Sequence, residues 1–189
     1  MAKELRIFRH SLKRGEFISP EGLELIKKII ETEKIEFDYL FSSPYTRAIQ
    51  TGTAILENLG IKMSKFSIVE DLACLPVEES MLGNKDFLAY WKSNPTAEIY
   101  EILDAVYTAE EISWMEEKCF CMIKTCFKNM PENTKAVAIS HNPYVSLAAN
   151  YICKERKYGN MKEMSFIDFT TEDADFIEEA QLIKVVQKK

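Results

Sequence analysis

The sequence LRIFRHSLKRG, residues 5–15, joins a short apolar run to a polar loop that contains glycine. The apolar run predicts a buried strand over residues 5–8, and the loop after it begins with Arg9 and His10. A helix is expected to begin near Ser19-Pro20, because serine accepts hydrogen bonds from a first helical turn and proline suits the first helical position. This order of strand, turn and helix is typical of α/β proteins.

The same unit occurs twice more. DYLF (38–41) is expected to form a strand, followed by SSP and a helix that Ser43 caps and that ends near Gly60. AVAIS (136–140) is expected to form a strand, followed by HNP and another helix, which Asn142 caps. Three further strands are expected, in KFSIV (65–69), SFIDF (165–169) and QLIKVV (181–186). Strands that alternate with amphipathic helices predict a three-layer α/β/α sandwich around a mostly parallel sheet.

Residues 71–134 are expected to be a mostly helical insertion in a single domain of residues 1–189. A loop is expected over residues 70–84, and a helix begins at Thr108, which can form a capping box with Glu111. The Met, Cys and aromatic residues of that helix indicate core packing rather than a cofactor site. The insertion could cover a pocket or form a dimer interface, so the oligomeric state stays open.

Composition excludes several classes of function. The net charge of -6 argues against nucleic acid as a partner, because nucleic-acid binders normally carry a basic face. No apolar stretch approaches the ~20 residues that span a bilayer, and the N-terminus does not resemble a signal peptide. We therefore expect no membrane partner and a cytoplasmic location. Five cysteines, an odd number, indicate reduced thiols rather than a disulfide framework.

The only two histidines, His10 and His141, each follow a predicted strand. Arg9 precedes the first of them, and Arg47 lies in the first turn expected after the second strand. Because ligands of open α/β sheets bind at the carboxyl ends of the strands, we expect these four side chains to converge. Arginine forks and helix N-termini bind phosphate, and an imidazole can attack phosphorus. The set predicts a phosphate site, and its arginines disfavour a metal ion held by the histidines.

Three motifs, RIFRHS, FSSPYTRAIQT and VAISHNPYV, resemble the histidine phosphatase superfamily (phosphoglycerate mutase-like, branch 1). The resemblance covers about residues 4–70 and 135–170. Within the family, the sequence most resembles the short bacterial phosphohistidine phosphatases. It implies a phosphoglycerate mutase-like fold and a phosphatase that needs no metal or cofactor. His10 would be phosphorylated during the reaction. The implied residues of the phosphate pocket are Arg9, Arg47 and His141, with substrate contacts expected from Ser11, Arg14, Ser43 and Asn142.

Two features depart from the family pattern. Ser11 stands where the family usually has glycine, so it would be strained if the backbone there needs a positive φ; otherwise it could add a hydrogen-bond donor at the pocket rim. The general acid is not defined by the sequence. Its candidates are Glu70, Asp71, Glu78 and Glu79, with Glu78 preferred by its distance from the preceding strand and Glu79 next.

The substrate is expected to be a phosphorylated small molecule or a phosphoprotein. A poorly defined acid would favour a phosphohistidine or an aryl phosphate over a sugar phosphate, because imidazole leaves easily. Lys13 and Arg14 could meet a second anionic group, and the missing Trp-Asn signature disfavours mutase activity. The alternative is a non-catalytic module that binds phosphate or a phosphoprotein in the same pocket.

Overall fold

The computed structural model describes residues 3–33, 35–95, 97–141, 143–157, 164–169 and 182–187. Within them, a six-stranded sheet has the order β5-β4-β6-β1-β8-β7. Its strands are β1 (Lys3–Arg9), β4 (Tyr39–Ser42), β5 (Phe66–Ile68), β6 (Lys135–Ser140), β7 (Met164–Phe169) and β8 (Leu182–Gln187). β1, β6, β4 and β5 pair in parallel, whereas β8 is antiparallel to both of its neighbours. The six expected strands and the mostly parallel sheet are confirmed.

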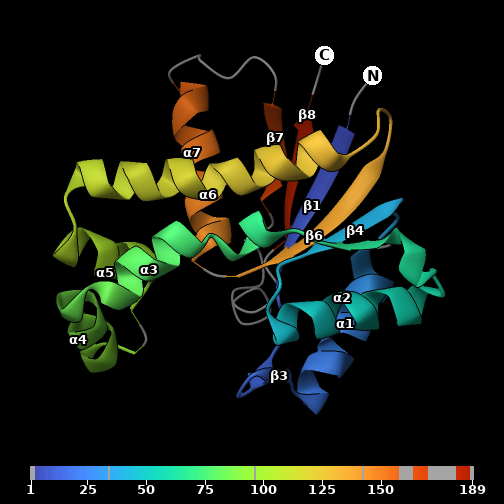
Figure 1. Cartoon of the computed structure of the whole chain (residues 1–189), viewed down its shortest axis with the longest axis horizontal. Coiled ribbons are helices and arrows are strands. Elements are labelled where there is room, and N and C mark those ends of the chain that lie inside the picture. The colour runs from blue at the N-terminus through green and yellow to red at the C-terminus, as the bar shows by residue number, and fades with distance from the viewer. Residues whose placement is uncertain are drawn as a thin grey trace.

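Helices cover both faces of this sheet (Figure 1). The helix α1 (Pro20–Glu33) and the helix α2 (Thr46–Leu59) lie on one face, and α6 (Ala109–Asn129) and α7 (Tyr144–Lys157) lie on the other. The remaining helices and short elements are α3 (Leu75–Gly83), α4 (Lys85–Ser93), α5 (Ile99–Val106), the 3-10 turns η1 (Met63–Lys65) and η2 (Glu70–Ala73), and the hairpin strands β2 (Lys13–Arg14) and β3 (Phe17–Ile18). The predicted three-layer sandwich is therefore confirmed.

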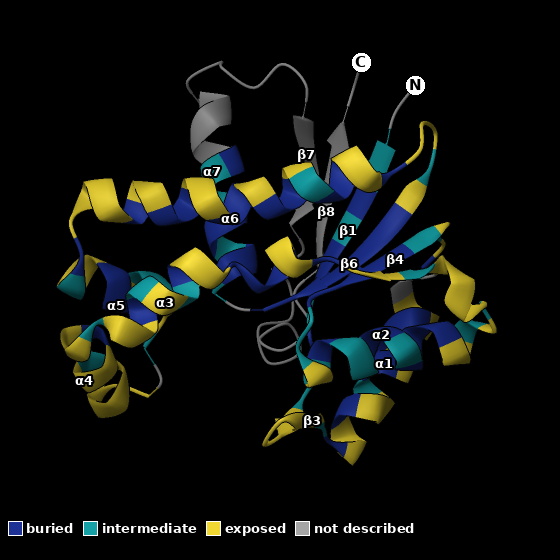
Figure 2. Cartoon of the chain, viewed as in Figure 1, coloured by how far each residue is buried: buried dark blue, intermediate teal, exposed yellow. Residues whose placement is uncertain are grey.

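The central strands β4 and β6 are buried on both faces, as their apolar sequences predict. Alternate residues of β6 divide between two cores: Val137 and Ile139 pack with α1 and α2, whereas Ala136 and Ala138 belong to the core beneath α6 and α7. On α6, the buried residues face the sheet and the exposed residues face away from it (Figure 2). The two cores hold the carboxyl ends of β1, β4 and β6 at one edge of the sheet.

Two of the three expected helix starts can be compared with the structure. The N–H of Gly22 donates to Ser19 Oγ at 3.1 Å, so Ser19 caps α1 as predicted. The prediction that Ser43 caps α2 was wrong, because α2 begins at Thr46 after Tyr45 and the Ser43 hydroxyl binds His141 instead. The third expected cap, Asn142, lies outside the described residues.

The central segment is helical, with one correction. The loop expected over residues 70–84 was wrong, because η2 and α3 occupy it. The apolar residues of α3 do not gather in one stripe and its first turn has no side-chain cap, so the periodic pattern that indicates a helix is missing there. The capping box of Thr108 and Glu111 is confirmed at the start of α6. α6 lies with α7 over one face of the sheet, and α3, α4 and α5 lie beside the sandwich (Figure 1).

Four cysteines with described side chains are free thiols. Cys74, Cys119 and Cys126 are buried, and Cys121 is exposed. The sulfurs of Cys74 and Cys119 lie 3.3 Å apart, between the start of α3 and α6. Cys74, Cys119 and Cys126 contribute to the core. No helix in the described part of the chain combines the length and the hydropathy that a membrane span requires.

Candidate active site

The carboxyl ends of three adjacent parallel strands bring the predicted site residues together. His10 follows the last residue of β1, and its N–H donates to the carbonyl oxygen of Ser140, the last residue of β6, at 2.9 Å. His141 follows Ser140 directly. The N–H of Ser43, just after β4, donates to Ile139 O at 3.0 Å. The predicted convergence of these strand ends is therefore confirmed.

The two histidine rings lie side by side in this cluster. Their centroids are 5.0 Å apart and their planes are tilted by 55°. His10 Nδ1 lies 2.8 Å from the carbonyl oxygen of Ser11. Because a carbonyl oxygen only accepts hydrogen bonds, Nδ1 carries the ring proton of neutral His10. The lone pair of His10 is therefore on Nε2.

Both imidazoles are neutral near pH 7. Burial lowers the pKa of His10 to about 4, opposed by the hydrogen bond to Ser11 O and helped by the charges of Arg47, Arg9 and Lys13. Burial also lowers the pKa of His141 to about 2, together with His10 and the same three cations. A neutral imidazole keeps the lone pair that a nucleophile needs, whereas an imidazolium has none.

His141 is held by the residue that follows β4. Its Nε2 lies 2.6 Å from Ser43 Oγ, and both residues are buried. Its Nδ1 is buried and has no hydrogen-bond partner among the described residues. When Ser43 donates to Nε2, Nδ1 carries the ring proton and offers a buried donor to an anion.

Tyr45 and Arg47 join the cluster from the start of α2. The Arg47 guanidinium carbon lies 5.0 Å from the centroid of the Tyr45 ring. The same ring meets His141 edge-on, with centroids 5.0 Å apart. Arg47 Nη1 is 3.9 Å from the exposed Glu16 carboxylate, while its Nε is buried without a partner among the described residues. Arg47 therefore keeps hydrogen-bonding capacity for a ligand.

One of the four candidate acids contacts this cluster. The Tyr45 hydroxyl donates to Glu78 Oε2, in the first turn of α3. Glu79 is exposed, and adjacent helical residues project about 100° apart, so its side chain leaves α3 in a different direction. The other two candidates also lie elsewhere: Glu70 is exposed, and Asp71 accepts a hydrogen bond from Thr125 of α6 at 2.5 Å.

Ser11 supports the loop after β1 rather than the pocket rim. It is 2% exposed, its hydroxyl donates to Gly22 O at 2.9 Å, and its N–H donates to Thr51 Oγ1 at 3.2 Å. It is not one of the residues with positive φ, so serine is not strained here. The rim-donor interpretation of Ser11 was therefore wrong, because the hydroxyl proton is already committed to α1.

Lys13 and Arg14, the two basic residues of the first loop, lie in different surroundings. Arg14 is exposed in β2, and its charge acts on Glu21. Lys13 instead contributes to the lowered pKa of both histidines, so its charge lies nearer the pocket. Asn142, the last predicted substrate contact, lies outside the described residues.

The charge of the cluster suits an anion. Arg9, Arg47 and Lys13 surround two neutral imidazoles, and such cations bind phosphate through charge-assisted hydrogen bonds. In the described part of the chain, no group of three or more His, Cys, Asp or Glu side chains could hold a metal ion.

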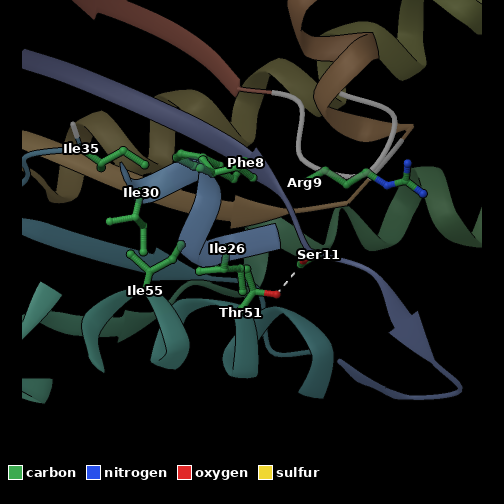
Figure 3. Close-up of a pocket in the computed structure, with 9 residues that line it drawn as sticks. Phe8, Arg9, Ser11, Ile26, Ile30, Ile35, Thr51 and Ile55 are labelled. Carbon is green, nitrogen blue, oxygen red and sulfur yellow. Dashed lines mark hydrogen bonds between the residues drawn. The ribbon is translucent and has the colours of Figure 1, made fainter. Parts of the chain in front are cut away.

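A cavity near this cluster has a different character (Figure 3). It measures about 10 Å³ and lies between β1, α1 and α2, lined largely by isoleucines. Such a volume holds at most about one water molecule, and its apolar walls offer that water few partners. Figure 3 shows the Arg9 guanidinium pointing away from the isoleucines. The cavity is a packing gap beneath the site and not a substrate pocket.

Sequence patterns miss three residues of this region. Tyr45 lies within one of the quoted motifs, but nothing in the sequence indicates that its hydroxyl meets Glu78. Thr51 and Gly22 meet the loop after β1 from the two helices. Glycine at an internal helical position was the available signal for Gly22, because a glycine there weakens a helix unless close packing requires it.

Solved structures with the same fold include metabolic enzymes. A phosphoglycerate mutase from Bacillus anthracis matches with a TM-score of 0.58 and 12% identity, over 99% of this chain and 88% of that chain. A phosphoserine phosphatase from Entamoeba histolytica, in complex with 3-phosphoglyceric acid, matches with a TM-score of 0.54 and 16% identity, over 87% of this chain and 90% of that chain.

The protein histidine phosphatase SixA complexed with tungstate matches with a TM-score of 0.42 and 14% identity, over 79% of this chain and 76% of that chain. No protein-family model and no curated protein matches the sequence. The chain therefore has the phosphoglycerate mutase-like fold.

Proposed function

We propose that this protein is a phosphatase that uses His10 as its nucleophile and works without a metal ion. The observation that carries the proposal is the bond from His10 Nδ1 to Ser11 O. It fixes the proton of a neutral imidazole on Nδ1 and leaves the Nε2 lone pair for attack on phosphorus. Arg9, Arg47 and Lys13 supply the positive charge that a metal ion provides in other phosphatases.

The reaction takes place in two displacements. In the first, His10 Nε2 forms a bond to phosphorus as the bond to the leaving group breaks, and Glu78 gives the leaving group a proton. In the second, the Glu78 carboxylate takes a proton from water as the water oxygen attacks phosphorus. The N–P bond breaks, which returns the electron pair to Nε2 and releases inorganic phosphate.

His141 and the arginines bind the phosphoryl oxygens in both steps. The buried Nδ1 of His141 has no partner among the described residues, and it donates to one oxygen when Ser43 occupies Nε2. Arg47 binds through the guanidinium group that Glu16 only weakly engages. These donors are in place before reaction, so they stabilise the transition-state charge without reorganisation.

The substrate is a phosphomonoester or the phosphohistidine of a protein, bound in the cytoplasm. The alternative of a non-catalytic phosphate-binding module depended on strain at Ser11 or on a missing acid. Ser11 is unstrained, and Glu78 is bonded to Tyr45 beside His141. Both findings support the enzyme over the binding module.

Phosphate release from p-nitrophenyl phosphate and from a phosphohistidine peptide tests the proposal, in the presence of EDTA. We expect turnover by the wild type and a loss of at least about 10³-fold in His10→Ala, because the variant has no nucleophile. Binding of inorganic phosphate to both proteins serves as the control for an intact pocket. Turnover that survives His10→Ala would contradict the proposal, and phosphate binding without any turnover would support the binding module.

A further inference from the structure

Tyr45 connects the phosphate pocket to the acid of a different helix. It precedes the first residue of α2, and its hydroxyl donates to Glu78 Oε2 in the first turn of α3. α2 covers the sheet, whereas α3 lies beside the sandwich (Figure 1). The hydrogen bond therefore joins the part of the molecule that holds the phosphate to the part that carries the acid.

The ring of Tyr45 is fixed by the pocket itself. The Arg47 guanidinium carbon lies 5.0 Å from its centroid, and His141 meets it edge-on at 5.0 Å. Both contacts have favourable geometry, a cation near an aromatic ring and an edge-to-face pair. With the ring held in this way, the direction of the hydroxyl is determined by the groups that bind phosphate.

The hydroxyl stays protonated wherever the enzyme works. Burial and the neighbouring Glu78 raise the pKa of Tyr45 to about 12. Tyr45 is therefore a hydrogen-bond donor throughout the neutral range. Its partner atom is Oε2, which leaves Oε1 of the same carboxyl group to carry the proton for the leaving group.

From this geometry we infer that Tyr45 is a positioning residue for Glu78, and that its hydroxyl sets how well the enzyme expels poor leaving groups. The inference rests on the proposed function. An aliphatic alkoxide is strongly basic and leaves only when it is protonated, whereas a nitrophenolate is a weak base and leaves without help. A misplaced acid therefore slows an aliphatic phosphomonoester far more than an aryl phosphate.

Tyr45→Phe tests this because it removes the hydroxyl and keeps the ring contacts with Arg47 and His141. We expect kcat/KM for glycerol 2-phosphate to fall about 10- to 100-fold and that for p-nitrophenyl phosphate to fall less than about 3-fold. The matched control is Tyr107→Phe. The Tyr107 hydroxyl donates to Ser80 O of the same helix α3 at 3.3 Å, and we expect its variant to leave the ratio of the two substrates unchanged.

A double-mutant cycle with Glu78→Gln separates positioning from a general structural effect. If Tyr45 acts through Glu78, Tyr45→Phe should have no further effect on glycerol 2-phosphate in the Glu78→Gln background. Equal losses on both substrates, or losses that multiply with Glu78→Gln, would overturn the inference. So would turnover of the aryl phosphate alone by the wild type.

The same assays on His10→Ala distinguish this failure from failure of the proposed function. Turnover of both substrates that depends on His10, with an unchanged substrate ratio in Tyr45→Phe, would overturn the role of Tyr45 and leave the phosphatase intact. Absence of any turnover that depends on His10 would overturn both.

Discussion

Ser11 illustrates how a single substitution can be read in opposite ways. The family resemblance suggests glycine after the first Arg-His pair, so serine there raised the possibility of a strained, weakened site. In the structure its φ is not positive, and its hydroxyl donates to Gly22 O at 2.9 Å. The serine therefore ties the loop that carries His10 to α1.

Replacing Ser11 with alanine should lower stability more than catalysis. The variant loses a buried hydrogen bond, and we expect the free energy of unfolding to fall by about 1 kcal/mol in urea titrations. The KM for p-nitrophenyl phosphate should change less than about 3-fold, because the hydroxyl faces α1. Ser67→Ala, at an exposed position of β5, is the control. Unchanged stability with a raised KM would show that Ser11 binds substrate.

For single residues, the sequence predicts which side chains form the site better than it predicts the hydrogen bonds between them. His10 and His141 could be assigned because two scarce residues followed comparable strands. Glu78 could be preferred within a set of four but not assigned, because the choice depends on the direction in which α3 leaves η2. Tyr45 could not be predicted at all, since its partner is 33 residues away and in another helix.

At the scale of the elements, the contact between α1 and the loop after β1 depends on Gly22. A Cβ added there would meet the backbone oxygen of Leu12 and would lie 2.9 Å from Ile18 Cγ1. The backbone cannot yield as a flexible side chain can. The loop that positions His10 would therefore have to move.

Gly22→Ala should be destabilising even though alanine favours helices. We expect a loss of about 1–3 kcal/mol in the free energy of unfolding, together with reduced turnover. The matched control is Gly83→Ala at the end of α3, where nothing lies within 4 Å of the added Cβ. That variant should keep wild-type stability and activity. A neutral or stabilising Gly22→Ala would show that the loop does not need this close approach.

Elements with strong periodicity or clear end signals were predictable, and others were not. The strand of residues 5–8 and the capping box of Thr108 were recognised because each has a local physical signature. The helix α3 was missed because its apolar residues do not line one face. The start of α2 was misplaced because Ser43 binds His141 across the sheet, a competitor that no local pattern reveals.

At the scale of the whole molecule, the two buried histidines link folding to pH. Their pKa values are about 4 and about 2 in the folded chain, against 6.5 for an unperturbed histidine. Below pH 6.5 the unfolded chain therefore binds protons that the folded chain excludes. This contribution to stability is complete above about pH 6.5 and is lost as the pH falls.

We expect the free energy of unfolding in urea to fall by about 2 kcal/mol between pH 7 and pH 5.5. Each histidine contributes about half of this decrease. The double variant His10→Asn/His141→Asn should show less than half of that decrease over the same interval. The pH range stays above the ordinary pKa of carboxyl groups, so their protonation adds little. Equal stability of the wild type at the two pH values would show that the histidines are not buried as neutral groups.

The sandwich itself could be predicted from the alternation of strands and helices, but the order of its strands could not. Which strand lies between β1 and β4 depends on how β6 pairs with both. The site needs that order, because it places His10, His141 and Ser43 at adjacent strand ends.

The central claim is that His10 becomes phosphorylated, and trapping that intermediate is its most direct test. The protein is mixed with p-nitrophenyl phosphate, quenched in alkali within the first turnovers, digested and analysed by mass spectrometry. We predict a phosphoryl group on His10 that is stable in alkali, is released by acid and is absent from His10→Ala. A protein that turns over substrate while the peptide of residues 5–15 stays unmodified at every quench time would contradict the account.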